Sequence, residues 1–198
     1  MTDAMPPDPA LHLTDHDTVN AAVRTWLEVA VIGLNLCPFA KAVHVHQQIR
    51  YRVSDATASE HLIDDLKQEL LFLAECDSSL VDTTLLTLPR MLSDFLDYND
   101  FLDSADRLLS ELNLDGVLQI ASFHPHYQFA GSHPDDIDNF TNRSPYPILH
   151  LLRESSVDRA VAAFPNADAI VERNLETLRR LGHAGWTALD LPSAPIQK

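Results

Sequence analysis

Three short strand-like segments, the first alternating between apolar and polar residues and the other two mainly apolar, constrain the fold of this chain more than any other feature. They cover residues 43–53, 83–88 and 117–123, and the stretches 59–73 and 94–112 between them repeat apolar residues at helical spacing. Strand–helix–strand crossovers of this length favour parallel strands with right-handed connections. We therefore predict an α/β fold whose small, mostly parallel sheet of three or four strands is built from β-α-β-α-β units and flanked by helices.

Helices are also expected before and after this core. The stretch 14–36 has helical periodicity and becomes apolar nearly all round, which is typical of a deeply buried helix. Ser144 and Pro145 form a helix-start pattern, in which a capping side chain precedes a proline at the first helical position. Further helices are predicted over 155–164 and 166–181, so the C-terminal part of the chain should be helical.

A single domain accounts for the length of 198 residues. We place it at residues 15–191, between an acidic, proline-rich segment at 1–14 that we expect to be disordered and a loose tail at 192–198. The chain contains no apolar run of about 18 residues. It also lacks a basic segment followed by an apolar one, so no secretory signal is expected. The sequence predicts a cytoplasmic protein without a membrane segment.

The charge balance argues against one class of partner. The chain has 14 basic and 29 acidic residues and a formal net charge of −15. Nucleic-acid binding relies on Lys and Arg side chains that displace the counterions of the phosphates. We therefore expect no nucleic-acid partner and predict a small-molecule ligand instead. An anionic ligand would require a local positive pocket on this acidic protein.

The segment from Ala121 to Glu154 holds a dense group of reactive side chains, including four of the ten histidines. It contains a loop of about twenty residues, whereas an ordinary connection has roughly 2–6. Long packed loops in compact domains are often functional. We therefore predict that the functional site lies at this loop.

The predicted sheet places other candidate residues beside this loop. Ligands of open α/β sheets collect at the edge where the carboxyl ends of the strands meet. That edge would present Arg90, His124 and the helix starts at Ser93 and Ser144, whose free N–H groups attract anions. We predict an enzyme in which His124 acts as acid or base in hydrolysis or group transfer on a small anionic or polar metabolite. The residues expected to bind this substrate are Arg90, Tyr127, Asn139, Asn142, Arg143, Ser144 and Arg153.

The helix predicted after Ser144 suggests a pair of residues that could assist His124. His150 and Glu154 are four residues apart, so on a helix they are neighbours that can form an ion pair. A carboxylate partner raises the pKa of a histidine and fixes its tautomer. We predict a proton relay or a supporting pair behind His124, and an ordinary surface ion pair is the alternative.

Other chemistries stay open at this stage. His124, His126, Asp135 and Asp136 are plausible ligands for a divalent metal, although their spacing matches no known metal motif. Cys37 is a possible nucleophile if the loop folds back onto it. No glycine-rich nucleotide motif occurs, so no organic cofactor is predicted. The alternative to an enzyme is a non-catalytic ligand-binding or protein-interaction module.

Three runs of the sequence resemble one known family. GLNLCPFA (33–40), SFHPHYQFAG (122–131) and TNRSPYPILHLLRE (141–154) are similar to a bacterial family catalogued as domain of unknown function 1415. The resemblance extends over nearly the whole chain after its first fifteen residues. No activity is assigned to this family, so the resemblance implies membership but no reaction, substrate or cofactor.

Overall fold

The computed structural model describes residues 15–163 and 168–193, so the predicted disordered segment 1–14 and residues 194–198 of the predicted tail lie outside it. The helices and strands, in chain order, are α1 (His16–Trp26), η1 (Leu27–Ile32, a π-helix), α2 (Ala40–Val45), β1 (Ile49–Val53), α3 (Ser59–Glu75), β2 (Thr83–Thr87), α4 (Phe95–Glu111), β3 (Leu118–Phe123), η2 (Ile137–Asn142, a 3-10 helix), β4 (Ile148–Arg153), α5 (Glu154–Ala162) and α6 (Asp168–Thr187). Among these described helices, none is long and apolar enough to cross a membrane.

The strands form one mixed sheet in the order β1-β2-β4-β3. β1 pairs with β2 in parallel, and β4 runs antiparallel to both of its neighbours, β2 and β3. The strands β1, β2 and β3 therefore point in the same direction, and β4 is inserted between β2 and β3. This confirms the predicted α/β fold with a small helix-flanked sheet, and it brings the carboxyl ends of β1, β2 and β3 to one edge.

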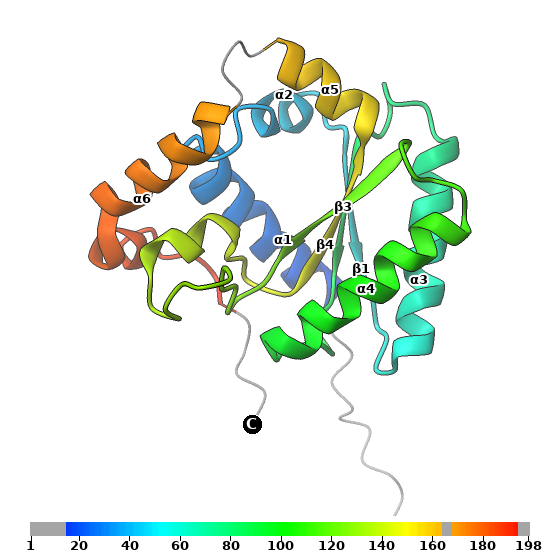
Figure 1. Ribbon diagram of the computed structural model, residues 1–198, viewed down its shortest axis with the longest axis horizontal. Coiled ribbons are helices and arrows are strands. Elements are labelled where there is room, and N and C mark those ends of the chain that lie inside the picture. Colours follow the sequence, from blue (N-terminus) through cyan, green and yellow to red (C-terminus); the bar gives the residue numbers. More distant parts are fainter. Residues whose placement is uncertain (1–14, 164–167, 194–198) are drawn as a thin grey trace, which may run out of the picture.

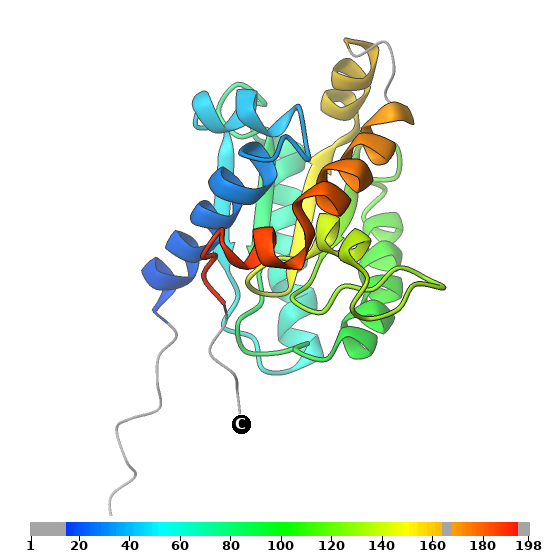
Figure 2. The same ribbon diagram turned by 90° about the vertical axis from the view of Figure 1, so that its left-hand side faces the viewer.

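Helices cover both faces of this sheet. Figure 1 shows α3 and α4 on one side and α1, α2 and α6 on the other, and Figure 2 shows α1 and α6 from the second direction. Leu149 and Leu151 of β4 belong to the apolar cluster beneath α3 and α4, whereas Ile148 packs with α1 on the opposite face. Because β4 is covered on both faces, four of its six side chains are apolar.

The helix predicted to begin at Ser144 is wrong, because Ile148–Arg153 forms strand β4. Two physical reasons explain the error. A short apolar run fits a buried strand as well as a buried helix. Tyr146 also precedes Pro147, and a residue before proline favours extended backbone over helix. Strands β2 and β3 then supply backbone hydrogen-bond partners on both sides of β4.

The strand predicted at 43–53 is right only in its second half. Ala40–Val45 forms helix α2, and β1 begins at Ile49 after a turn in which Gln47 has a φ of 58°. The alternation of Val and His that favoured a strand is too short to exclude a helical turn. On the helix, Ala40 and Val43 are three residues apart and share one side, where both line a cavity described below.

Candidate functional site

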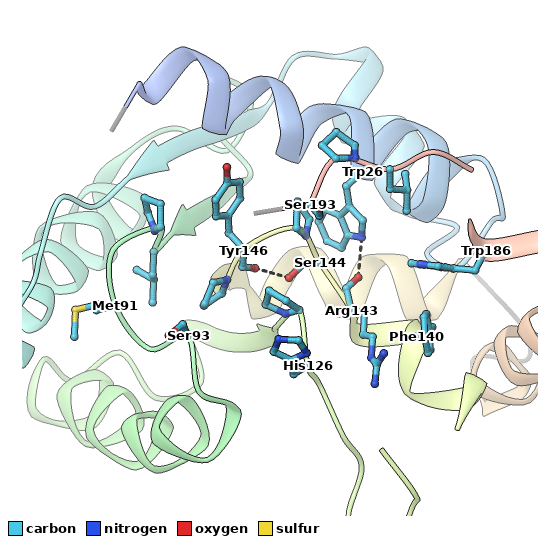
Figure 3. A pocket seen from close by; sticks show the side chains of 17 residues that line it. Trp26, Met91, Ser93, His126, Phe140, Arg143, Ser144, Tyr146, Trp186 and Ser193 are labelled. Carbon is cyan, nitrogen blue, oxygen red and sulfur yellow. Dashed lines mark hydrogen bonds between the residues drawn. The ribbon is translucent and has the colours of Figure 1, made fainter. Parts of the chain in front are cut away.

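A cavity of about 560 Å³ opens at the edge of the sheet where the chain leaves β2 and β3 (Figure 3). We call it the edge cavity. It is lined by Trp26, Leu88, Pro89, Met91, Ser93, Pro125, His126, Phe140, Arg143, Ser144, Pro145, Tyr146, Pro147, Trp186, Leu191, Pro192 and Ser193. These residues come from the segments after β2 and β3, the segment before β4, the end of α1 and the C-terminal part of the described chain. The cavity therefore lies at the predicted edge.

Aromatic side chains give the edge cavity firm apolar walls. Both tryptophans of the chain line it, together with Phe140 and Tyr146. Trp26 is held in place because its Nε1 donates a hydrogen bond of 2.9 Å to the backbone oxygen of Arg143. Trp186 meets Phe140 edge to face, with 5.2 Å between the ring centroids. Such walls suit a ligand with a flat apolar part.

The charge of the lining comes from the guanidinium of Arg143. Arg143 and His126 line the edge cavity, and no Asp or Glu does so among the described residues. The guanidinium of Arg143 lies 4.0 Å from the centre of the Phe140 ring, and it donates to the backbone oxygens of Pro134 (2.6 Å) and Tyr127 (3.5 Å). Burial lowers its pKa, but an arginine remains charged at neutral pH. The edge cavity is thus locally positive on a strongly acidic protein.

His124, the predicted acid or base, is fully buried and does not line the edge cavity. Its Nδ1 accepts a hydrogen bond from the backbone N–H of His126, and its Nε2 lies 3.0 Å from the backbone oxygen of Leu92. Since Nδ1 is an acceptor, Nε2 carries the proton and donates to Leu92. Burial lowers the pKa of His124 to about 4. Both nitrogens of this neutral ring therefore form hydrogen bonds with the backbone.

The asparagines and the tyrosine of the loop also contact other parts of the protein. Asn139 is buried, accepts from the Phe129 N–H at 3.0 Å and donates to the His133 oxygen at 2.8 Å. Asn142 donates to the Ser122 oxygen at 3.1 Å, and the ring of Tyr127 packs against Phe95 and Phe129. None of Tyr127, Asn139 and Asn142 lines the edge cavity.

Neither of the two helix starts that were predicted to bind an anion is available: one is capped by a carboxylate, and at the other no helix begins. The carboxylate of Asp94 caps α4 by accepting from the N–H groups of Leu96 and Asp97, so a ligand anion has no access to those donors. Ser144 begins no helix; it lines the edge cavity, and its hydroxyl donates to the Tyr146 oxygen at 2.5 Å. Arg90 follows β2 but is not part of the lining.

Arg153 and Glu154 lie away from this edge, because β4 runs antiparallel and its carboxyl end pairs with the beginnings of β2 and β3. Arg153 is buried and donates to the backbone oxygens of Cys76 (2.5 Å) and Val81 (3.1 Å). Glu154 begins α5. No hydrogen bond or ion pair joins it to His150 within the described parts of the chain, so the predicted helical pair is not formed.

His150 and Cys37 instead line a second cavity, of about 320 Å³, which we call the sheet-face cavity. It lies over the side chains of the sheet that point toward α1 and α2, and Leu85, Ala121 and Leu152 are among its other lining residues. The sequence prediction treated Cys37 and His150 as separate candidates. The fold brings them to one cavity.

The structure shows no metal centre among the residues that it describes. No group of three His, Cys, Asp or Glu side chains there could hold an ion. Of the predicted ligands, His124 has both nitrogens in hydrogen bonds, and Asp135 and Asp136 lie in an exposed turn where the Asp136 carboxylate accepts from the His133 N–H.

Sequence reasoning missed the aromatic walls of the edge cavity. Trp26 looked like an ordinary core residue of the first helix, and Trp186 belonged to no recognised pattern. One signal was available in the residue type, because large amphipathic rings are favoured in ligand pockets. That signal alone would not have placed them together.

Comparison with known proteins identifies the family. No curated protein and no solved structure matches the chain. The model of the family described as protein of unknown function (DUF1415) matches residues 18–188, which include all the strands and both cavities apart from a few lining residues at the C-terminal end. The resemblance carried by the three sequence runs is thereby confirmed, and the chain belongs to the DUF1415 family.

Proposed function

We propose that the chain binds a small molecule with a flat apolar body and an anionic group, and that the edge cavity is its site. The observation that carries this proposal is the lining itself. It combines four aromatic rings with a guanidinium and an imidazole, and no carboxylate belongs to it among the described residues. On a chain with a net charge of −15, such a lining supplies the local positive site that an anion requires.

Arg143 is the group best suited to the anion. Its Nη2 and Nε donate to backbone oxygens of the loop, which fixes the guanidinium beside Phe140. Nη1 makes no hydrogen bond within the described parts of the chain, so its donors are left for a ligand carboxylate or phosphate. His126, whose exposed ring also lines the cavity, supplies a second donor when protonated or in the suitable tautomer.

Ligand binding is favoured over hydrolysis or group transfer at this site. Catalysis of that kind needs a group that transfers protons within reach of the reacting atoms. His124 cannot serve without breaking a hydrogen bond to the loop backbone, and no serine hydroxyl of the lining bonds to His126 among the described residues. The predicted enzyme therefore has no assembled catalytic pair here, and we propose the binding function alone.

The test uses 1-naphthoate as a probe and uncharged 1-naphthamide as its control. We expect 1-naphthoate to raise the melting temperature in a concentration-dependent way. We expect the amide to bind at least tenfold more weakly, since a charge-assisted hydrogen bond contributes roughly 1.5–3 kcal/mol. Isothermal titration calorimetry then gives the affinities directly.

Variants locate the site. His126→Ala removes a ring that makes no described hydrogen bond, so it should weaken 1-naphthoate binding several-fold without changing the melting temperature of the free protein. Arg143→Met should weaken it about tenfold or more. His46→Ala, at an exposed position outside the cavity, is the matched control and should change neither quantity. The proposal fails if 1-naphthoate does not bind, or binds equally well to both cavity variants.

A further inference from the structure

The sheet-face cavity differs from the edge cavity in position and chemistry. It lies on the side of the sheet where Figure 1 shows α1 and α2, over the beginnings of β1 and β2. Trp26 is the one described residue that lines both cavities, and its ring meets Phe123 edge to face with 5.2 Å between the centroids. These two rings therefore stand between the cavities.

His150 is a polar group at the centre of an apolar floor. In the sheet it lies opposite Leu85 of β2 and Ala121 of β3, and all three line the cavity. The remaining walls are mostly aliphatic, for example Val31. A histidine at the middle of an interior strand, with its side chain lining a mostly apolar cavity, is unusual for a residue with only a structural role.

The hydrogen bonds of His150 fix what it presents to the cavity. The hydroxyl of Thr83 donates to the Leu151 oxygen at 2.7 Å, so it must accept the 2.7 Å bond from Nε2 of His150. Nε2 thus carries the proton and Nδ1 is an acceptor. Within the described residues, no hydrogen bond engages Nδ1. Burial lowers the pKa of His150 to about 4, which keeps the ring neutral at pH 7.

The lining also defines the charge of a suitable ligand. No Lys or Arg lines the cavity among the described residues, and the neutral imidazole offers no positive charge, so an anion is disfavoured. Asp82 lines one end, where its carboxylate accepts from the Ser156 hydroxyl at 2.6 Å. A suitable ligand therefore has an apolar body that matches the aliphatic lining and one hydrogen-bond donor for Nδ1.

We propose that the sheet-face cavity is a second binding site, which takes a small uncharged alcohol or phenol with an apolar body and bonds its hydroxyl to Nδ1 of His150. This proposal does not depend on the function proposed for the edge cavity. The ligand of the edge cavity is anionic, whereas that of the sheet-face cavity is uncharged. Their probes and variants are also different, so the failure of either proposal does not affect the other.

The chain contains its own reporter for this site. Cys37 is a free cysteine that lines the cavity, and Cys76 is a free cysteine of the same exposure class that does not. We expect 4-propylphenol to slow the alkylation of Cys37 by iodoacetamide and to leave that of Cys76 unaffected, as measured by mass spectrometry of the proteolytic peptides that contain each cysteine. Equal protection of both thiols, or of neither, would overturn the proposal.

Two variants test the chemistry. His150→Phe keeps a ring but removes the acceptor, so 4-propylphenol should bind about fivefold more weakly while propylbenzene, which has no hydroxyl, binds as before. Ala121→Leu fills the floor and should abolish binding of both, whereas Ala42→Leu, at an exposed position on α2, should abolish neither. If Ala121→Leu does not fold, the His150→Phe comparison decides alone. Unchanged phenol binding in His150→Phe would overturn the proposal.

Discussion

At the scale of single residues, His124 shows how a histidine that looks catalytic can be structural. Its ring lies between Phe95 and Tyr98, with centroid distances of 5.4 and 5.1 Å, and is removed from solvent. Its two nitrogens join the backbone at Leu92 to the backbone at His126. His124 therefore fastens the loop after β3 to the segment before α4, and it positions the edge cavity without lining it.

We predict that His124→Ala lowers the free energy of unfolding by about 3 kcal/mol, because it leaves a buried cavity and removes a partner from two backbone groups. His124→Gln should lose less, since its amide can replace one of the bonds. Urea denaturation measures both, with His46→Ala as a surface control expected to change by no more than about 0.5 kcal/mol. Full stability with loss of 1-naphthoate binding would restore a direct role for this residue.

At the scale of elements, strand β4 decides where the candidate residues lie. Its insertion between β2 and β3 sends Arg153 to the edge opposite the edge cavity and turns His150 toward the sheet-face cavity. At that edge Arg153 donates hydrogen bonds to the backbone oxygens of Cys76 and Val81. A residue predicted to bind substrate thus serves to join β4 to the segment before β2.

Arg153→Met should therefore lower the free energy of unfolding by about 2 kcal/mol, because two carbonyl groups lose a charged donor. The affinity for 1-naphthoate should not change. The matched control is Arg107→Met, at an exposed position of α4, which should alter stability by no more than about 0.5 kcal/mol. Weakened probe binding in folded Arg153→Met protein would contradict this assignment.

At the scale of the whole molecule, two neutral histidines tie stability to pH. His124 and His150 have pKa values lowered to about 4 in the folded protein, because burial disfavours their charged forms. The unfolded chain, in which histidine has an ordinary pKa of about 6.5, then binds more protons than the folded one between roughly pH 6.5 and 4. These two histidines therefore make stability fall as the pH falls through this window.

We predict that the free energy of unfolding decreases by on the order of 1–2 kcal/mol per histidine between pH 7 and pH 5. Denaturation with urea at several pH values measures this slope. His150→Phe and His124→Gln should each flatten it, since neither replacement titrates there, whereas His46→Ala should not. A slope that is unchanged in both His150→Phe and His124→Gln would show that other groups cause the pH dependence.

The sequence by itself determined the class of the fold and the edge at which to look. Segments 83–88 and 117–123 are apolar runs separated by amphipathic helices, so local periodicity was enough to identify β2 and β3. Their crossovers fixed the common direction of β1, β2 and β3, and with it the edge where the edge cavity opens.

Only the tertiary structure decided the rest. The run ILHLLR fits a helix or a strand, and the open place between β2 and β3 selects the strand, because backbone hydrogen bonds on both sides are available there alone. Whether a histidine transfers protons or holds the backbone in place depends on the groups that surround its two nitrogens. No local sequence pattern contains that information. Cys37 and His150 line one cavity, and Trp26 and Trp186 line another, although the residues of each pair are far apart in the chain. Which residues share a cavity follows from packing rather than from periodicity.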